Sequence, residues 1–305
     1  MNDAHIFIVG LPRTGTKLMR NVLCASPDTQ CRLTPESWYL GDLFRSGLVK
    51  SIRGLGDMSK DNNVERLVEL MYSGTVRGTY WNLLGSKHMP VPRQTMLDML
   101  KASDRSERAI YEVIMRAPVV ASDEPALADI AVLGDKMPGN LYHVPQLIEW
   151  FPNARIVHTF RDPRAILASE WRRLIDNRGE GWVHRLPRPL YSLATVFYVT
   201  VSWLYAVRLH RKYTQRYGDR YRLVRYEDLV GNPEATAREL CDFLDFKFDE
   251  TMLQPAQFGS SFAAKGGRGF DKRALDRWRE HLAPWMRTWI NLLTGSRLAQ
   301  FGYER

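Results

Sequence analysis

The segment Gly-Leu-Pro-Arg-Thr-Gly-Thr-Lys near the start of the chain combines two glycines with two threonines, an arginine and a lysine. An ATP-binding P-loop has the pattern G-x-x-x-x-G-K-[ST], in which the lysine reaches the terminal phosphates and the next hydroxyl holds Mg²⁺. Gly10 and Gly15 keep that spacing, but Thr16 stands in the lysine position and Leu18 follows Lys17. The segment therefore predicts a phosphate-binding loop without the residues that manage Mg²⁺ and a γ-phosphate.

A second group of anion-binding residues, Arg161, Ser169 and Arg173, recurs in steps of four. In a helix that begins near Pro163, Ser169 and Arg173 lie on one face, below Arg161 at the end of a strand. Arginine suits the forked recognition of phosphate, so the spacing predicts an oxyanion pocket distinct from the glycine loop. The neighbouring arginines are expected to be exposed: Arg164, Arg172 and Arg178.

Both groups directly follow short β-like runs. The predicted strands are Ile6 to Val9, Ala154 to Phe160, Tyr221 to Val224 and a weaker run, Ile130 to Leu133, that ends at Gly134-Asp135-Lys136. Helices are expected from about Thr16 to Leu23 and from Pro163 to about Ile175. Repeated strand-turn-helix units indicate an α/β fold with a central parallel β-sheet flanked by helices. Ligands bind beyond the carboxyl ends of such strands, so the polar clusters are expected to converge.

The rest of the chain is expected to be mostly helical. Residues from about Trp38 to Ala128, broken at Pro90 and Pro92, predict a helical insertion of about 40–128 over the site, where substrate selection would occur. Later features are a helix from Glu234 to Leu244, a glycine-rich loop from Lys265 to Gly269, and helices from about Lys272. Without repeats or low-complexity linkers, we expect one domain over residues 1–305.

The composition limits the classes of function. With 43 basic and 34 acidic side chains the formal charge is +9, which suits an anionic ligand, nucleic acid or a membrane surface. No helix-turn-helix spacing or zinc-ligand array favours nucleic acid, so none is expected as a partner. Cys24, Cys31 and Cys241 are odd in number and widely spaced, which indicates thiols in a reducing, cytoplasmic compartment and no metal site. The first strand begins near His5, so no signal peptide is expected.

One apolar stretch, Leu190 to Val207, raises the possibility of a membrane span. It contains four serines and threonines and is flanked by basic residues. It is also at the short end for crossing a bilayer, which takes about 20 apolar residues. We therefore expect a long core helix and no transmembrane segment.

These motifs resemble those of sulfotransferases that use 3′-phosphoadenosine 5′-phosphosulfate (PAPS). Pro12-Arg13-Thr14-Gly15-Thr16 resembles their 5′-phosphosulfate-binding loop, and Arg161-Asp162-Pro163-Arg164-Ala165 with Ser169 resembles their 3′-phosphate-binding strand and helix. Further similar motifs follow in the family's order: Asp135-Lys136-Met137-Pro138, Phe151-Pro152-Asn153-Ala154, Arg225-Tyr226-Glu227-Asp228-Leu229 and Ala274-Leu275-Asp276-Arg277-Trp278. The likeness is greatest to the protein-tyrosine-type and bacterial branch, and it implies the P-loop NTPase-like sulfotransferase fold.

The resemblance implies a role for each matching residue. The residues that would hold the 5′-phosphosulfate are Arg13, Thr14, Gly15 and Thr16, and those that would hold the 3′-phosphate are Arg161, Ser169 and Arg173. Tyr226 would lie against the nucleoside and Arg268 would close over it, while Lys136 would lie beside the sulfuryl group. The family usually has threonine or a small residue where Lys17 stands, so it is open whether Lys17 makes a fifth loop contact.

The resemblance also implies a catalytic base. The protein-tyrosine branch has a glutamate shortly after the first helix and second strand, where this chain has Glu36. The alternative for Glu36 is a carboxylate at a helix N-terminus after Pro35. His88 lies in a Lys-His-Met-Pro motif like that of the cytosolic branch, but about fifty residues too early, and we interpret it as a coincidence.

The predicted reaction is transfer of the sulfuryl group of PAPS to a hydroxyl acceptor, with an amine as the second acceptor class. Arg13 and Lys136 would stabilise the charge on the bridging oxygen without a metal ion, because a sulfuryl group carries less charge than a phosphoryl group. The acceptor could be a small molecule, a lipid, a sugar or a peptide. Two alternatives stay open: a P-loop kinase or NTPase, and a non-catalytic nucleotide-binding protein with the same fold.

Overall fold

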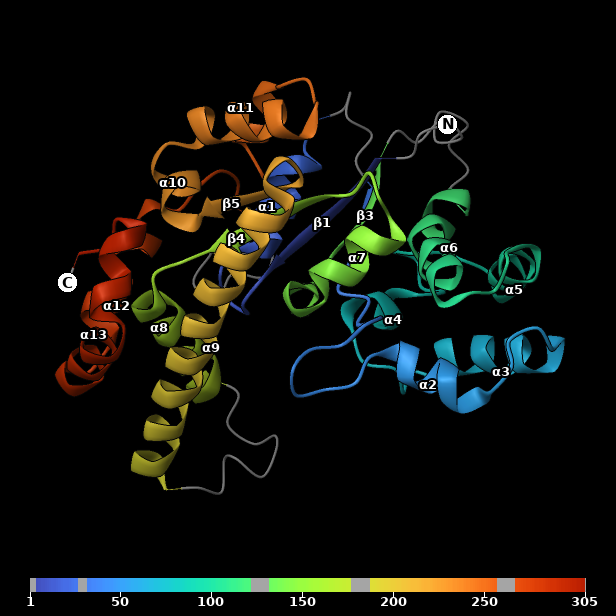
Figure 1. Cartoon of the computed structure of the whole chain (residues 1–305), viewed down its shortest axis with the longest axis horizontal. Coiled ribbons are helices and arrows are strands. Elements are labelled where there is room, and N and C mark those ends of the chain that lie inside the picture. The colour runs from blue at the N-terminus through green and yellow to red at the C-terminus, as the bar shows by residue number, and fades with distance from the viewer. Residues whose placement is uncertain (1–3, 27–31, 122–131, 177–186, 257–266, 305) are drawn as a thin grey trace. The chain divides into compact units, whose positions relative to one another are not determined.

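The structure is a computed structural model that describes residues 4–26, 32–121, 132–176, 187–256 and 267–304 (Figure 1). Its strands are β1 (Ala4–Gly10), β2 (Arg32–Pro35), β3 (Val132–Lys136), β4 (Arg155–Phe160) and β5 (Tyr221–Arg225). Helix α1 (Thr16–Leu23) follows β1, and the helices between β2 and β4 are α2 (Leu48–Leu55), α3 (Asp61–Met71), α4 (Thr79–Leu83), α5 (Arg93–Ala102), α6 (Glu107–Val120), η2 (Pro138–His143) and α7 (Val144–Trp150). The later helices are α8 (Pro163–Asp176), α9 (Arg188–Tyr217), η4 (Gly218–Arg220), α10 (Tyr226–Gly231), α11 (Pro233–Leu244), η5 (Glu250–Leu253), η6 (Lys272–Leu275), α12 (Arg277–His281), α13 (Pro284–Leu298) and η7 (Ala299–Phe301).

The strands form one parallel sheet in the order β2-β3-β1-β4-β5. Strands β3 and β2 lie on one side of β1, and β4 and β5, which come later in the chain, lie on the other. Such a change of direction in strand order marks the ligand-binding edge of an α/β sheet. Ile6, Ile8, Val9, Ile156 and Val157 are almost completely buried. Runs of this kind are typical of parallel strands covered on both faces. The predicted α/β sheet is therefore confirmed.

Two details of the predicted strands were wrong. Strand β3 does not stop before Gly134-Asp135-Lys136; it continues through these residues, because they pair in register with Ile6, Phe7 and Ile8 of β1. Strand β2 was not among the strands predicted from patterning. Its four residues are too few to show alternation, and it forms because β3 offers a long-range pairing partner.

The chain forms two compact units, each built from separate stretches of sequence. Unit 1 comprises residues 1–10, 23–158 and 219–222, and unit 2 comprises residues 11–22, 159–218 and 223–305. Strands β1, β2 and β3 belong to unit 1, and β4 and β5 begin there. The expectation of a single domain stays a prediction.

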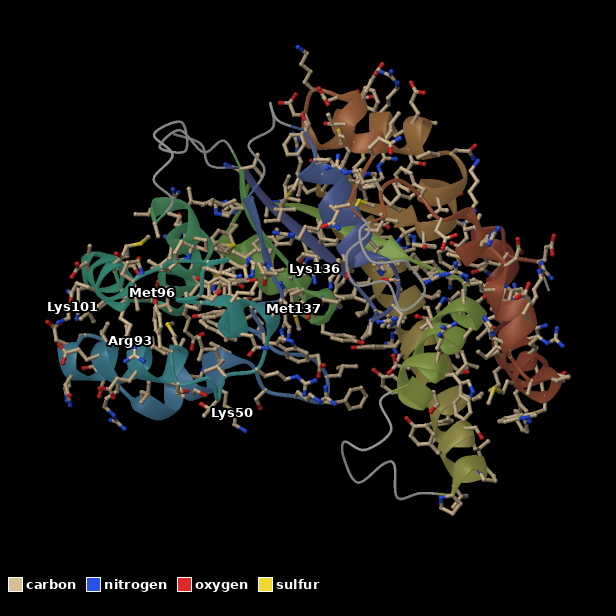
Figure 2. The ribbon with its side chains drawn as sticks, turned by 180° about the vertical axis from the view of Figure 1, so that it is seen from behind. Lys50, Arg93, Met96, Lys101, Lys136 and Met137 are labelled. Atoms are coloured by element: carbon tan, nitrogen blue, oxygen red, sulfur yellow. The ribbon has the colours of Figure 1, made fainter. Side chains whose placement is uncertain are left out.

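Unit 1 contains the predicted helical insertion, whose described part carries α2 to α6. Its helices enclose side chains that are almost fully buried, including Leu67, Tyr80, Met96 and Tyr111. Met96 lies among these helices in Figure 2, whereas the labelled Lys50, Arg93 and Lys101 lie on their outer side. Because the buried groups are mostly large and apolar, this region has a core of its own.

Unit 2 contains α9, a helix of 30 residues. Trp203 on α9 is completely buried, and its indole N–H donates to the carbonyl oxygen of Arg161 at 3.0 Å. By length and composition alone the segment Pro189–Arg220 could cross a bilayer, but half of its most apolar window is buried inside the protein. One face of α9 thus packs as expected of a core helix.

Candidate functional site

The loop after β1 has a backbone that few residue types tolerate. Gly15 has φ +93°, and a Cβ atom at this position would lie 2.5 Å from Cδ2 of Tyr226. Arg13 also has a positive φ, 71°, which costs a residue with a side chain about 1–2 kcal/mol. Strain of this kind is concentrated at ligand-binding sites. The loop conformation therefore points to a site built around these two residues.

The same loop leads into the first turn of α1, where backbone N–H groups lie outside the hydrogen-bonding pattern of the helix. The first hydrogen bond of α1 runs from the Met19 N–H to the Gly15 carbonyl at 2.9 Å, so the three preceding N–H groups have no acceptor within the helix. The buried Thr14 hydroxyl donates to the Leu11 carbonyl at 2.7 Å and lies 2.8 Å from the hydroxyl of Thr159. These bonds hold the loop in one shape, which leaves a set of N–H groups suited to an anion.

Two arginines meet beside this loop. The Arg13 Nε–H donates to Ser169 Oγ at 2.9 Å, and Arg161 donates to the carbonyls of Arg13 at 3.1 Å and of Ala274 at 3.0 Å. The Arg161 guanidinium lies 4.0 Å above the ring of Tyr226. We call Arg13, Arg161, Ser169 and Tyr226 the arginine cluster. The sequence predicted separate pockets for Arg13 and for Arg161 with Ser169, but direct hydrogen bonds connect them.

The arginine cluster is positively charged and partly buried. The hydrogen bonds described above go to hydroxyl and carbonyl oxygens, which are uncharged acceptors. Arg161 Nε is buried and has no hydrogen-bond partner among the described residues. Burial raises the pKa of the Tyr226 hydroxyl, so the ring stays neutral beside the guanidinium. Two guanidinium groups beside backbone N–H donors suit the recognition of a phosphate or sulfate group.

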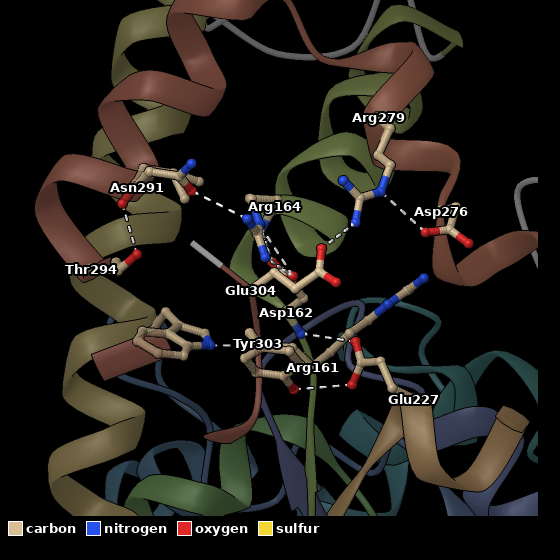
Figure 3. Close-up of polar contacts among 12 residues, drawn as sticks. Arg161, Asp162, Arg164, Glu227, Asp276, Arg279, Asn291, Thr294, Tyr303 and Glu304 are labelled. Atoms are coloured by element: carbon tan, nitrogen blue, oxygen red, sulfur yellow. Dashed lines mark hydrogen bonds and ion pairs between the residues drawn. The ribbon is translucent and has the colours of Figure 1, made fainter. Parts of the chain in front are cut away.

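A buried ion pair supports Arg161 from the next residues of the chain (Figure 3). Arg164 donates to Asp162 at 2.6 Å and lies 4.2 Å over the ring of Trp278. The backbone N–H of Asp162 donates to Glu227 Oε1 at 3.0 Å. The prediction that Arg164 is exposed was wrong: it is 2% exposed, because Asp162 balances its charge and Trp278 covers its flat face.

A second site lies in unit 1, where Glu36 directly follows β2. Pro35 and Lys136 are register partners of β2 and β3, and the Glu36 N–H donates to the Lys136 carbonyl at 3.1 Å. The side chains then meet, with Lys136 Nζ donating to Glu36 Oε1 at 2.6 Å. We call Glu36 and Lys136 the acid–base pair. The side chain of Lys136 is 2% exposed and that of Glu36 33%, so the carboxylate is the partner that solvent reaches.

Helix α4 approaches Glu36 from the insertion. A Cβ atom on Gly78, which has φ +135°, would lie 2.4 Å from the Glu36 carbonyl oxygen, so only glycine allows this approach. The Thr79 hydroxyl donates to Glu36 Oε2 at 3.2 Å. Thr79 and Lys136 therefore contact different oxygens of the Glu36 carboxylate.

The neighbour of Lys136 in β3, Asp135, is completely buried in a hydrogen-bonded network. Its Oδ2 accepts from Ser37 at 2.6 Å and from Tyr111 at 2.8 Å, and its Oδ1 accepts from Thr34 at 3.2 Å. Burial raises the pKa of Asp135, although these three donors and Lys136 act in the opposite direction. The network fixes β3 and the residue after Glu36, and so it positions the acid–base pair.

The structure places the other predicted site residues as follows. Thr16 is buried and Lys17 is exposed in the first turn of α1. Arg268 is exposed and forms an isolated β-bridge with Ala256. The side chain of Arg173 lies outside the described residues, as do Cys31, Arg178 and the start of the glycine-rich loop. His88 is exposed in a turn.

Several residues that shape the two sites were not predicted from the sequence. Ser37, Thr79 and Tyr111 support the acid–base pair, and Thr159 and Trp278 support the loop and the strand end. Trp278 was part of a matched motif, which was the only signal for it. The hydroxyl groups give no pattern because their partners are 24 to 145 residues away.

Among the described residues, no group of three or more histidine, cysteine, aspartate or glutamate side chains could hold a metal ion. The structure instead offers two kinds of polar chemistry. The arginine cluster and the loop offer positive charge and N–H donors for an anion, and the acid–base pair offers a proton acceptor beside an ammonium group.

The fold and these sites define a class of protein. A family model described as "Sulfotransferase family" matches residues 5–250, and the chain belongs to this family. Protein-tyrosine sulfotransferase of Drosophila melanogaster is 24% identical over 258 residues, which are 83% of this chain and 40% of that protein. The omega-hydroxy-beta-dihydromenaquinone-9 sulfotransferase Stf3 of Mycobacterium bovis is 23% identical over 79% of this chain and 63% of that protein. The chain thus spans about two fifths to three fifths of the length of these relatives.

Solved structures show the same fold. The sulfotransferase domain of the Synechococcus PCC 7002 olefin synthase has a TM-score of 0.61 at 22% identity and covers 99% of this chain and 96% of that chain. The sulfotransferase domain from the curacin biosynthetic pathway has a TM-score of 0.55 at 17% identity, with 99% and 98% covered. The predicted sulfotransferase fold is confirmed.

Proposed function

We propose that the protein transfers the sulfuryl group of PAPS to a hydroxyl acceptor, with an amine as the second acceptor class, and that transfer needs no metal ion. The observation that carries the proposal is the acid–base pair, in which a buried lysine donates at 2.6 Å to a carboxylate that is one third exposed. An ionised carboxylate that solvent reaches can accept the proton of an acceptor hydroxyl, and the ammonium supplies positive charge for a developing anion. Family membership supports the class of reaction.

The loop and the arginine cluster fit the donor by their chemistry. Arg161 Nε is a buried donor with no partner among the described residues, and the first turn of α1 has N–H groups that the helix does not use. In the proposal, the 5′-phosphosulfate is bound by Arg13, Thr14, Gly15 and Thr16, and the 3′-phosphate by Arg161, Ser169 and Arg173. Tyr226 lies against the nucleoside and Arg268 closes over it. Lys17, which is exposed in the first turn of α1, is proposed as the fifth contact of the loop with the donor.

Each catalytic residue then has one task. PAPS supplies a sulfuryl group bonded to a phosphate leaving group. Glu36 takes the proton from the acceptor hydroxyl, and Thr79 and Lys136 keep its two oxygens in place. An ammonium group has three donors, so Lys136 can bind Glu36 and also stabilise charge on the bridging oxygen together with Arg13.

The acceptor and the location are the least constrained parts of the proposal. The relatives are named for protein tyrosine and for a hydroxylated menaquinone, which supports peptide and lipid acceptors. Hydroxyl groups of sugars and other small molecules are further acceptor classes of the proposal. A cytoplasmic location is part of the proposal, and the support for it is Cys241, a buried thiol whose sulfur lies 3.7 Å from that of Met252.

The test is a single-turnover assay with radiolabelled PAPS, without Mg²⁺, against a panel of tyrosine peptides, phenols, hydroxylated lipids and sugars. Label is expected to move to at least one acceptor, and Lys136→Met should slow transfer by about 10²–10³-fold while 3′-phosphoadenosine 5′-phosphate still binds. The matched control is Lys101→Met, because Lys101 also pairs with a glutamate, Glu65, at 2.8 Å but on the surface (Figure 2).

Two results would contradict the proposal. Magnesium-dependent binding of ATP that exceeds binding of the 3′-phosphorylated nucleotide would favour a kinase or NTPase. Tight binding of PAPS with no transfer to any acceptor class would indicate a nucleotide-binding protein without catalysis.

A further inference from the structure

Helix α9 carries a row of exposed apolar side chains that the proposed reaction does not use. Leu190, Leu193, Phe197, Val201 and Tyr205 are 56%, 51%, 66%, 47% and 37% exposed. They are three or four residues apart, so they lie on one face of the helix. From Leu190 to Tyr205, 16 residues, the row extends roughly 22 Å.

A second exposed row lies on α13, which packs beside α9 in unit 2 (Figure 1). It consists of Trp285, Trp289, Leu292 and Leu293, of which Leu292 is 75% exposed. The two rows are continuous, because Leu193 of α9 lines one open groove of about 580 Å³ with Trp285 and Trp289. We call these exposed side chains of α9 and α13 the apolar face. An exposed apolar surface of this extent marks a site of interaction.

The opposite side of α9 rules out a helix surrounded by lipid. Ser192, Thr195, Thr200 and Ser202 are buried there, and the first three donate to carbonyls of the preceding turn at 2.8–2.9 Å. A helix that spans a bilayer alone is apolar on all sides, whereas α9 is apolar and exposed on only one. The apolar face is therefore suited to lie on a surface and not to cross it.

The charge around the apolar face indicates which kind of surface the protein binds. Neither α9 nor α13 contains an aspartate or glutamate. Beyond Tyr205 the exposed positions of α9 become basic: Arg208, Arg211, Lys212 and Arg216. A second copy of the chain would bring only further basic residues from these helices, whereas anionic lipid headgroups would complement them.

We propose that the apolar face docks this protein on the surface of an anionic lipid bilayer, with the tryptophans and leucines entering the headgroup region and the basic end of α9 on the lipid phosphates. Tryptophan and tyrosine are enriched at the membrane–water interface, and leucine and phenylalanine supply the buried apolar area of helices that lie in it. The proposal does not depend on the sulfuryl-transfer reaction.

The test is flotation of the full-length protein with vesicles of phosphatidylcholine alone and of phosphatidylcholine mixed with phosphatidylglycerol. The protein is expected to float with the anionic vesicles, and high salt should weaken this binding because exposed charges are screened. The double variant Trp289→Ser/Leu292→Ser should lower the partition coefficient about tenfold or more. Lys212→Glu with Arg208→Glu should lower it on anionic vesicles.

Matched controls come from unit 1. Leu43→Ser/Phe44→Ser removes an exposed apolar pair of similar size, and Lys50→Glu reverses an exposed charge (Figure 2). Both controls should float like the wild type, and thermal melting should show that all variants are folded. The proposal is overturned by wild-type protein that does not float, by equal binding to neutral vesicles, or by equal loss in the Leu43/Phe44 control. The proposal is also overturned if the wild type does not bind vesicles and is a dimer in light scattering, and if the Trp289/Leu292 variant is a monomer. The apolar face would then bind a second copy of the chain.

Discussion

The acid–base pair and the arginine cluster hold their charges in opposite ways. In the acid–base pair, Lys136 is matched by Glu36 at 2.6 Å, so the charges balance before any ligand arrives. In the arginine cluster, Arg13 donates to a hydroxyl and Arg161 donates to carbonyls, which are uncharged acceptors. The first arrangement suits a proton transfer, and the second suits binding of an anion.

The two sites also differ in what holds them. The arginine cluster is built largely from motif residues and from the loop backbone, with Gly15 packed against Tyr226. The acid–base pair depends on helices of the insertion, because Thr79 of α4 and Tyr111 of α6 hold Glu36 and Asp135. The arginine cluster thus depends mainly on the loop, whereas the acid–base pair depends on the insertion.

The largest effect is expected from Glu36→Gln. If Glu36 is the base, turnover falls by about 10²–10⁴-fold, because a neutral amide cannot take the proton. Affinity for 3′-phosphoadenosine 5′-phosphate, measured by calorimetry, should be unchanged, which would separate the pair from the arginine cluster. Glu65→Gln is the control with the same chemical change on the surface. Full activity of Glu36→Gln on the true acceptor would remove Glu36 from the role of base.

Arg161→Met is expected to weaken binding of the nucleotide and to leave the rate of transfer nearly unchanged. Loss of a charged donor costs about 1.5–3 kcal/mol, which corresponds to roughly 10–150-fold weaker binding of 3′-phosphoadenosine 5′-phosphate. Turnover at saturating donor should change much less. The control is Arg279→Met, an exposed arginine that also lies over an aromatic ring, Trp278 at 4.6 Å. If Arg161→Met lowers turnover and leaves binding unchanged, the division of labour between the two sites is wrong.

Asp135→Asn should change how stability depends on pH. Burial raises the pKa of Asp135 in the folded protein, so the folded state binds this proton more tightly than the unfolded state. Its contribution to stability is full below the unfolded value of about 3.9 and is lost as the pH rises through the raised folded value. Urea unfolding across this range should show a fall in the free energy of unfolding with rising pH that Asp135→Asn removes. The same slope in both proteins would mean that another group titrates.

Ser169→Ala is expected to have the smallest effect. The hydroxyl accepts one hydrogen bond from Arg13 at 2.9 Å and leaves the guanidinium charge in place. Donor affinity should fall by a few fold, since a hydrogen bond of this kind contributes about 0.5–1.5 kcal/mol net. Ser192→Ala is the control, because the Ser192 hydroxyl donates at 2.9 Å to the Pro189 carbonyl within α9. A loss as large as that of Arg161→Met would mean that Ser169 positions Arg13 as well.

How far the sequence predicts this molecule depends on the range of the interactions. The strand before Gly10 and helix α1 follow from local periodicity, and the α8 boundary follows from Pro163. The ends of β3 and the presence of β2 depend on pairing between distant segments, which no local pattern contains. The burial of Arg164 has the same cause, because Trp278 lies more than a hundred residues further along the chain.

The positive φ of Arg13 separates what favours stability at this position from what favours activity. A glycine there would adopt φ 71° without steric cost, so replacing the arginine relieves backbone strain while it deletes the guanidinium. Selection of heat-resistant variants alone would therefore tend to discard Arg13, and selection for turnover would restore it. Position 13 is where a stabilised version of this protein is expected to lose its chemistry first.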